Sequence, residues 1–204
     1  MKLYYAETGN PRKPCAVAKY LGLPVEYVHI DLSKGENRTP EYLAINPNGK
    51  VPALTDGDFM LWESNAIMIY LAQKADSDLW PTDIKTQVDI LRWLHWETAH
   101  FSRHGGRLCF EHYIKKSFGL GEPDPDEVTD ASKFFDRFAR VLDTHLKGRN
   151  YLVADRLTVA DFGVAAYLPF AEKAQLPLEE FSEINRWHNK LLEIPAWREP
   201  FPNS

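Results

Sequence analysis

The pair Glu63-Ser64 stands at the start of a run with helical spacing, and such a position can hold an anion. The first N–H groups of a helix have no partner within the helix, and the helix dipole adds partial positive charge there. The Ser64 hydroxyl and N–H can therefore hold a carboxylate, while the Glu63 carboxylate can accept from an ammonium group. The alternative is an ordinary capping serine beside an exposed glutamate.

A second group of side chains carries metal-ligand chemistry but has unsuitable spacing. It consists of His100, His104, Cys109 and His112, of which the first two are four residues apart. We expect Gly105-Gly106 to interrupt the helix between them, and no supporting carboxylate pattern is visible. The sequence therefore predicts no metal site.

The composition is that of a mildly acidic globular protein. The chain has 204 residues, 44% hydrophobic residues and a formal net charge of −5, which argues against nucleic-acid binding. No apolar run is long enough for a membrane helix, and the N-terminal residues lack a signal-peptide pattern. The cysteines Cys15 and Cys109 form no CxxC pair, and we expect both to be structural. These features predict a cytoplasmic protein.

The first part of the chain predicts the elements that would position Glu63-Ser64. Apolar and alternating residues indicate strands at 3–6 and 26–32 around a helix at 14–21. Two short strands, 52–55 and 58–61, flank Asp56-Gly57, which favours a tight hairpin because both central residues need a positive φ. A helix over 64–74 follows. This order is typical of an α/β unit.

The remainder of the chain shows almost only helical periodicity. A polar segment at 77–85 predicts a linker, and a loop with two prolines follows at 119–126. The acidic stretch 122–130 is interpreted as a solvated connector. Thr158 and Asp161 have the spacing of a capping box, the clearest helix start in the chain, and a last helix is expected at 183–193.

Three segments together resemble cytosolic glutathione S-transferases: 46–54 (NPNGKVPAL), 63–67 (ESNAI) and 157–162 (LTVADF). In that family they are the cis-proline loop, the γ-glutamyl site and the capping box of the helical domain. The resemblance implies an α/β plus all-α fold. A thioredoxin-like domain would span 1–76, a linker 77–85 and an all-helical domain 86–204. It also implies a two-fold homodimer.

The resemblance implies a glutathione site. Glu63 and Ser64 would hold the γ-glutamyl group, and Val51, before a cis Pro52, would pair with the cysteinyl backbone. The cations expected near the glycyl carboxylate are Lys50 and Arg38, with Asn37 as a polar alternative. Both cations can also be plain surface charges.

The sequence departs from most of the family at the residue that would activate the glutathione thiol. The loop at 7–14 contains no Ser, Tyr or Cys. Its Thr8-x-Asn10 spacing is instead similar to the bacterial nu class, where a Thr and an Asn donate to the sulfur. The helical domain looks closer to the theta class, in which Arg103 would correspond to an arginine near the thiolate. Alternatively, Asn10 is a helix cap and Arg103 forms a salt bridge. An omega-like nucleophilic Cys15 is disfavoured because it lies too deep in the helix.

By the same resemblance, the long helix after the linker would line the electrophile pocket. The candidates are Trp96, His100, Phe101, Tyr113 and Tyr167. At helical spacing, aromatic residues are equally typical of a core.

The resemblance therefore implies a glutathione transferase that uses glutathione as co-substrate, without a metal, against a small hydrophobic electrophile in detoxification. One alternative is a glutathione-dependent disulfide-bond oxidoreductase acting on a disulfide. A second is a non-catalytic interaction module with the transferase fold. No nucleic acid or membrane partner is expected.

Overall fold

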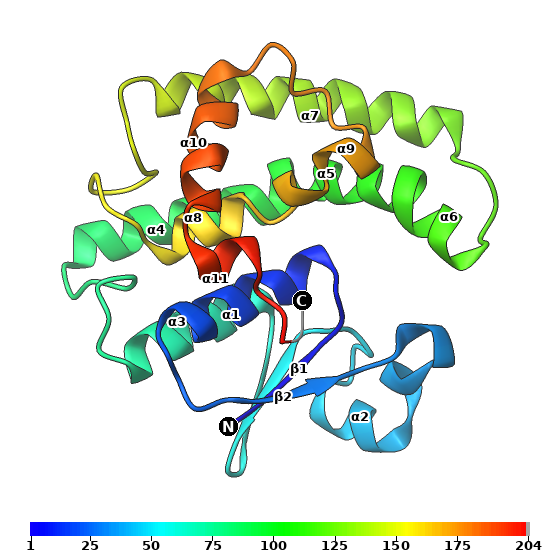
Figure 1. Cartoon of the computed structure of the whole chain (residues 1–204), viewed down its shortest axis with the longest axis vertical. Coiled ribbons are helices and arrows are strands. Elements are labelled where there is room, and N and C mark those ends of the chain that lie inside the picture. Colours follow the sequence, from blue (N-terminus) through cyan, green and yellow to red (C-terminus); the bar gives the residue numbers. More distant parts are fainter. Residues whose placement is uncertain (203–204) are drawn as a thin grey trace. The chain divides into compact units, whose positions relative to one another are not determined.

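The computed structural model describes residues 1–202, and the chain forms two compact units (Figure 1). The first unit contains Met1–Pro81 together with the described residues from Ile194 to residue 202, and the second contains Thr82–Glu193. Within residues 1–202, no helix combines the length and the apolar character that crossing a membrane requires.

The first unit is a thioredoxin-like α/β domain, as predicted. Its sheet has the order β2-β1-β3-β4, in which β1 is parallel to β2 and antiparallel to β3. The strands are β1 (Lys2–Tyr5), β2 (Glu26–His29), β3 (Ala53–Asp56) and β4 (Phe59–Trp62). The helices are α1 (Gly9–Tyr20), α2 (Pro40–Ile45), α3 (Ser64–Lys74) and α11 (Pro195–Arg198), with short 3₁₀ turns at Leu32–Lys34 and Glu36–Arg38.

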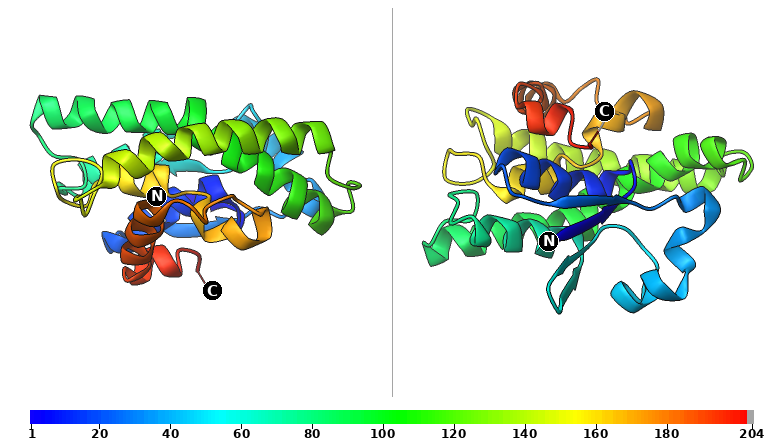
Figure 2. Two further views of the ribbon diagram at one scale, coloured as in Figure 1. Left: turned by 90° about the horizontal axis from the view of Figure 1, so that it is seen from above. Right: turned by 60° about the horizontal axis from the view of Figure 1, so that its bottom comes forward.

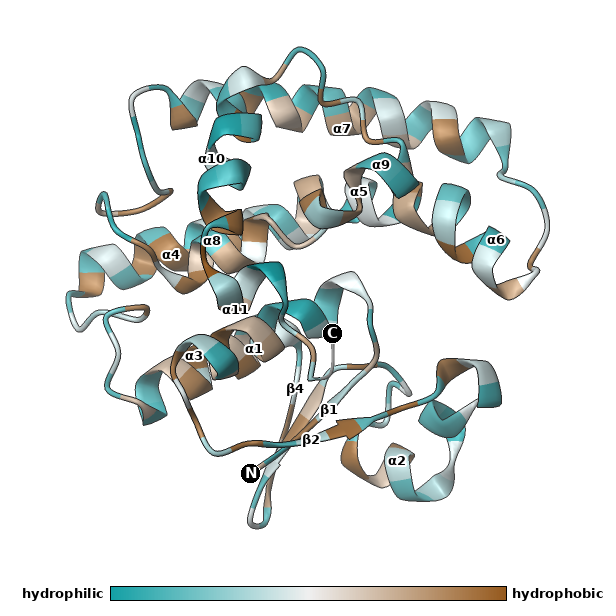
Figure 3. Ribbon diagram, viewed as in Figure 1, coloured by the Kyte–Doolittle hydropathy of each residue, from teal (hydrophilic) through white to brown (hydrophobic). Residues whose placement is uncertain are grey.

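Hydrophobic residues concentrate on α1 and α3, which pack against each other (Figure 3). Ile67, Met68 and Leu71 of α3 are fully buried, as are Cys15 and Val17 of α1. The helix at 64–74 has the predicted bounds, whereas α1 begins five residues before the predicted start at residue 14. Pro11 does not oppose the helix there, because the first N–H groups have no helical acceptor. Pro14 lies inside the helix and leaves the Asn10 carbonyl without its helical donor.

The hairpin is in the predicted place, but its turn differs by one residue. Asp56 belongs to β3, and the two central residues are Gly57 and Asp58. Only Gly57 has a positive φ, of 59°. The turn therefore requires the left-handed conformation at its first central position alone, rather than at both as expected.

The second unit is built on one long helical rod that passes through two π-helical turns. The rod consists of α4 (Ile84–Trp96), a π turn at Glu97–Phe101, α5 (Ser102–Cys109), a π turn at Phe110–Ile114 and α6 (Lys115–Phe118). The predicted interruption at Gly105-Gly106 is wrong, because both glycines lie inside α5. A Cβ on Gly106 would lie 2.9 Å from the Tyr167 ring, so this glycine permits close packing instead of ending the helix.

Helix α7 (Pro125–Leu146) runs alongside this rod in both views of Figure 2 and contacts α5. The predicted connector at 122–130 is therefore shorter than expected. Asp124 caps α7 through Asp126 N and Glu127 N, and the acidic residues after Asp124 lie on the helix. Acidic side chains suit a helix N-terminus, which explains the charge run without a loop.

The remaining helices of the second unit are α8 (Val159–Val164), α9 (Ala171–Ala174) and α10 (Ser182–Leu192). The capping box is confirmed: Thr158 and Asp161 bond each other's backbone N–H groups at the start of α8. Burial raises the pKa of the Asp161 carboxyl to about 6, while its hydrogen bonds act in the opposite direction.

The segment from Ile194 onward belongs to the first unit, whereas the sequence analysis placed it in a helical domain over 86–204. Trp197 of α11 is fully buried, and α11 contacts α1. Local periodicity cannot distinguish these alternatives, because a short helix is assigned to a domain by long-range packing.

Candidate glutathione site

A small cavity of about 120 Å³ lies in the first unit where the starts of α1 and α3 meet the loop before β3. It is lined by Asn10, Asn46, Asn48, Lys50, Val51, Pro52, Glu63 and Ser64. Six of the residues predicted to bind glutathione thus line this cavity, namely Asn10, Lys50, Val51, Pro52, Glu63 and Ser64. The volume is well below that of a pocket enclosing a whole small ligand, so it suits part of a peptide.

The loop before β3 is held by the side chains beneath it. The Val51–Pro52 peptide bond is cis, as predicted. The Lys50 carbonyl oxygen accepts from Asn46 Nδ2 at 2.6 Å and from the Tyr42 hydroxyl at 2.7 Å. Asn46 is 2% exposed and also accepts from the Asn48 backbone N–H at 3.1 Å. These contacts fix the backbone of Val51 at the cavity.

Asn46 and Asn48 were not predicted as site residues, although both lie in a segment that carried the resemblance. The available signal was the Asn-Pro-Asn-Gly sequence, in which asparagine side chains commonly bond the backbone of their own turn.

Glu63 and Ser64 occupy the start of α3. Ser64 is the first helical residue and is 7% exposed at the cavity. Glu63 has φ 74° and ψ 113°, a left-handed conformation that is rare for a residue with a side chain. Such strained residues persist where the surrounding structure fixes them, often at ligand sites. The free N–H groups of α3 make this end of the cavity suitable for a carboxylate.

Asn10 lies in the first turn of α1 and lines the cavity, whereas Thr8 does not. Thr8 is the residue before the helix, and its side chain makes no capping hydrogen bond. Of the two predicted thiol activators, the structure therefore brings only Asn10 to the cavity. Asn10 is exposed, so its amide is available to a ligand.

Two buried cations follow Asn10, and the sequence analysis did not assign them to the site. Arg12 is 7% exposed and Lys13 is 2% exposed. Lys13 Nζ donates to Asn65 Oδ1 at 3.2 Å, which links the first turn of α1 to the residue after Ser64. Their positive charge, with two helix starts, favours an anion at the cavity. The signal available was only two adjacent cations, which usually lie at the surface.

Asn37 and Arg38 lie outside the residues that line the cavity. Asn37 Nδ2 donates to the Gly49 carbonyl at 2.7 Å and so supports the loop from behind. Gly49 has φ 59°, and a Cβ there would lie 2.8 Å from Arg38 Nη1. Asn37 thus holds the loop by a hydrogen bond, and Arg38 lies close to Gly49.

Arg103 belongs to the second unit. It lines a separate cavity of about 600 Å³ between α5 and α7. The other lining residues are His104, Gly106, Arg107, Phe110, Glu127, Asp130, Ala131 and Phe134. His104 stacks on Phe134 with ring centroids 5.1 Å apart, and burial lowers the pKa of His104.

The predicted electrophile residues are distributed over two places in the second unit. Trp96 and Phe101 stack on each other at 5.7 Å, and Phe101 is 2% exposed. His100 stacks on Phe138 of α7 at 4.6 Å. These three residues pack between the rod and α7 and do not line either of the two cavities described above.

Of the other two candidates, Tyr113 packs near α9 and the turn before it, and Tyr167 packs on α5. The ring centroids of Tyr113 and Phe170 are 6.2 Å apart. Lys173 Nζ lies 4.9 Å from the centroid of the Tyr113 ring. Tyr167 lies against Gly106, and burial raises its pKa. Among residues 1–202, no group of three or more His, Cys, Asp or Glu side chains is arranged to hold a metal ion.

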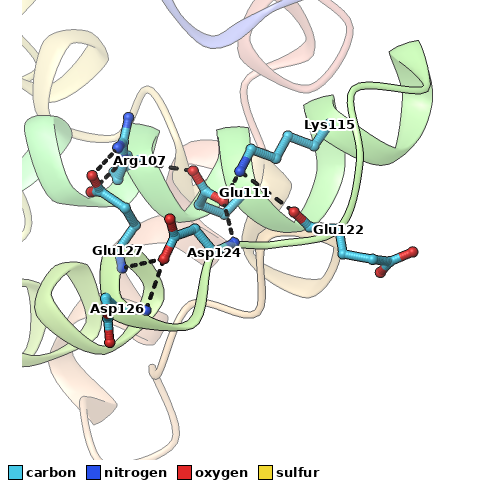
Figure 4. Close-up of polar contacts among 7 residues, drawn as sticks. All are labelled: Arg107, Glu111, Lys115, Glu122, Asp124, Asp126 and Glu127. Carbon is cyan, nitrogen blue, oxygen red and sulfur yellow. Dashed lines mark hydrogen bonds and ion pairs between the residues drawn. The ribbon is translucent and has the colours of Figure 1, made fainter.

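Acidic and basic side chains near the end of the rod form a network around the buried Glu111 carboxylate (Figure 4). The Glu111 carboxylate is 1% exposed and accepts from Lys115 Nζ at 2.6 Å and from the Asp124 backbone N–H at 2.8 Å. Burial alone would raise the pKa of Glu111, but these donors outweigh it and the net pKa is lowered. The network ties the 119–124 loop to the rod and is structural.

The first unit presents a cis-proline loop beside the start of α3, and a helical unit follows. This combination defines a two-domain protein of the thioredoxin-like class with an anion-binding geometry in its α/β unit.

Known proteins show the same combination. The glutathione S-transferase N-terminal domain family matches residues 1–73, and the C-terminal domain family matches residues 104–195. Glutathione S-transferase F10 of Arabidopsis thaliana is 36% identical over 191 residues, which covers 87% of this chain and 85% of that protein.

Two solved structures extend the likeness to the fold. Glutathione transferase F7 from Populus trichocarpa has a TM-score of 0.90 at 25% identity, covering 98% of this chain and 96% of that one. A glutathione transferase from Pseudomonas putida, with one glutathione disulfide bound per subunit, has a TM-score of 0.88 at 26% identity, covering 98% and 89%. The chain belongs to the glutathione S-transferase family.

Proposed function

We propose that this protein is a glutathione transferase whose first unit holds glutathione at the cavity beside α3. The observation that carries the proposal is the meeting of Val51, before the cis Pro52, with Ser64 and Asn10 around one cavity. The start of α3 would bind the γ-glutamyl carboxylate, and Val51 would pair with the cysteinyl backbone. Lys50 would lie toward the glycyl carboxylate.

The reaction needs a thiolate rather than a protein nucleophile. A free cysteine thiol has a pKa of about 8.5, so lowering it by about two units needs about 2.7 kcal/mol of selective stabilisation. Several groups on this chain favour the thiolate anion. They are the Asn10 amide, the start of α1 and the buried charges of Arg12 and Lys13. The thiol proton leaves to solvent, and the sulfur attacks a small hydrophobic electrophile, whose leaving group departs or whose double bond takes up a proton.

The electrophile and the assembly are part of the same proposal. The second substrate would be a small hydrophobic electrophile, and the protein would act as a homodimer. Exposed apolar side chains on the edge strand β4, Phe59, Met60 and Trp62, support an interface between two copies. The free, buried cysteines fit a reducing compartment, so we place the protein in the cytoplasm.

Calorimetric titration with reduced and oxidised glutathione tests the proposal. Ser64→Ala removes a contact to a charged group, so its Kd for reduced glutathione should rise about 10–100-fold. Ser182→Ala is the matched control, because Ser182 is also the first residue of a helix, exposed and in the second unit. Its Kd should equal that of the wild type.

The two ligands separate the alternatives. Tighter binding of reduced glutathione, with turnover of an aromatic halide, supports the transferase. A clear preference for oxidised glutathione would favour a disulfide oxidoreductase. No binding of either by a folded wild type would leave a non-catalytic interaction module.

A further inference from the structure

The first turn of α1, which carries Asn10, has little local support. Thr8 makes no capping hydrogen bond, and no acidic residue lies in that turn. Arg12 and Lys13 instead place two cations near the positive end of the helix, which is locally unfavourable. Pro14 has no N–H to donate to the Asn10 carbonyl. Contacts from other parts of the first unit must therefore hold this turn in place.

The segment from Ile194 onward supplies such a contact through Arg12. The Arg12 guanidinium donates from Nη2 to the Trp197 carbonyl and, at 3.3 Å, to the Arg198 carbonyl. It also lies over the Trp197 indole, 4.8 Å from the ring centre. Burial lowers the pKa of Arg12 to about 10, so the group remains charged at neutral pH.

Two further contacts fix the segment along the first unit. Phe201 stacks on Tyr5 at 5.7 Å, and Lys19 Nζ donates to the Glu199 carbonyl near the other end of α1. Arg12 is therefore the contact nearest to Asn10. The Arg12 backbone N–H also donates to the Thr8 carbonyl at 3.2 Å, so a displaced Arg12 would move the turn that contains Asn10.

We propose that Arg12 is a positioning residue. Its hydrogen bonds to the Trp197 and Arg198 carbonyls hold the first turn of α1 and so fix the position of the Asn10 amide. The position of this amide in turn sets how strongly the site stabilises the glutathione thiolate. This inference rests on the proposed function. It gives the C-terminal segment a role in the chemistry of the first unit, although the segment does not line the cavity.

The test compares Arg12→Gln, which removes the charge, with Arg12→Lys, which retains it. Because both of these hydrogen bonds come from Nη2 alone, a lysine should restore part of the effect. Lys19→Gln is the matched control, since Lys19 bonds the same segment but lies in the last turn of α1. Three quantities are measured: the pKa of bound glutathione from its thiolate absorbance, the Kd for S-methylglutathione, and amide hydrogen exchange over residues 9–13.

The proposed role of Arg12 predicts an effect on the thiol pKa but not on ligand affinity. In Arg12→Gln the pKa of the bound thiol should rise by about one unit, which is a tenfold lower thiolate-to-thiol ratio. The Kd for S-methylglutathione, which has no thiol to ionise, should change by less than about twofold. Exchange over 9–13 should accelerate, Arg12→Lys should lie between wild type and Arg12→Gln, and Lys19→Gln should match the wild type.

Other results overturn the proposal. If Arg12→Gln lowers only the melting temperature and leaves the pKa of the thiol unchanged, Arg12 is merely structural. Should Arg12→Gln not fold, the milder Arg12→Lys is judged by the same criterion. A wild type that binds no glutathione refutes the proposed function separately, and unchanged exchange over 9–13 would still refute the proposed role of Arg12.

Discussion

Replacement of Asp161 should strongly destabilise the second unit and leave the cavity at Asn10 and Ser64 untouched. The Asp161 carboxylate is fully buried and accepts from Leu152 N at 3.0 Å, Thr158 N at 2.9 Å and Trp187 Nε1 at 3.1 Å. The Thr158 hydroxyl donates to it at 3.2 Å. In Asp161→Ala the three N–H donors lose their acceptor where water has no access.

The expected cost follows from these donors. An orphaned buried donor costs about 1–3 kcal/mol, so three donors at about 1.3 kcal/mol each give about 4 kcal/mol. Since 1.4 kcal/mol is a factor of ten, the unfolding constant should rise about a thousandfold. Asp143→Ala is the matched control, because Asp143 accepts from Glu183 N at 2.9 Å and Ile184 N at 3.1 Å but is only half-buried. Water can replace that acceptor, so its cost should be about 1 kcal/mol.

Denaturant unfolding at a fixed protein concentration near pH 8 measures both costs. Circular dichroism and tryptophan fluorescence should give coincident transitions, with a lower midpoint and an unchanged slope. If Asp161→Ala costs no more than Asp143→Ala, water reaches the orphaned donors and the argument from burial is refuted.

Three further predictions concern other contacts. Because Lys115 and the loop backbone hold the pKa of Glu111 below its ordinary value, the ionised form stabilises the fold above about pH 4.5. The unfolding free energies of wild type and Glu111→Gln should therefore converge as the pH falls below that value, and a pH-independent difference would contradict this. Under the proposed homodimer, light scattering should give a dimer mass for the wild type. Trp62→Arg places a charge on the exposed apolar edge of β4, so this variant should show the 23.5 kDa monomer, and a dimer mass for the variant would exclude this edge from the interface. Gly106→Ala should destabilise by about 1–2 kcal/mol because its Cβ would meet the Tyr167 ring at 2.9 Å. In a Tyr167→Ala background the same change should instead stabilise by about 1 kcal/mol, and equal effects in both backgrounds would show that the ring yields.

Local signals predicted several elements of both units well. The helix over 64–74 and the capping box at Thr158 were confirmed, because a short-range hydrogen-bond pattern and an apolar stripe are encoded in adjacent residues. The cis bond at Val51–Pro52 was predicted only through the resemblance, since an isolated X–Pro bond is usually trans.

Features that depend on distant contacts could not be predicted in the same way. Lys13 is buried because Asn65, 52 residues away, receives its ammonium group. Gly105 lies inside a helix where Phe135 and Tyr167 pack closely on it, so this glycine serves packing rather than a helix end. Asn37 donates to the Gly49 carbonyl, 12 residues along the chain. In each case the deciding partner lies outside any local window of sequence.

The discontinuity of the first unit has a consequence for biosynthesis. Its sheet and α1 leave the ribosome early, but the segment that buries Trp197 against α1 is synthesised only after the whole second unit. Domains commonly fold from the N-terminus as they emerge, at about 5–20 residues per second. In this chain the side of α1 that contacts α11 stays uncovered in the nascent first unit. It is covered only after the 112 residues of Thr82–Glu193 have been synthesised. Completion of the glutathione domain is thereby coupled to synthesis of nearly the entire chain, and a truncated product would expose an apolar surface that chaperones and proteases recognise.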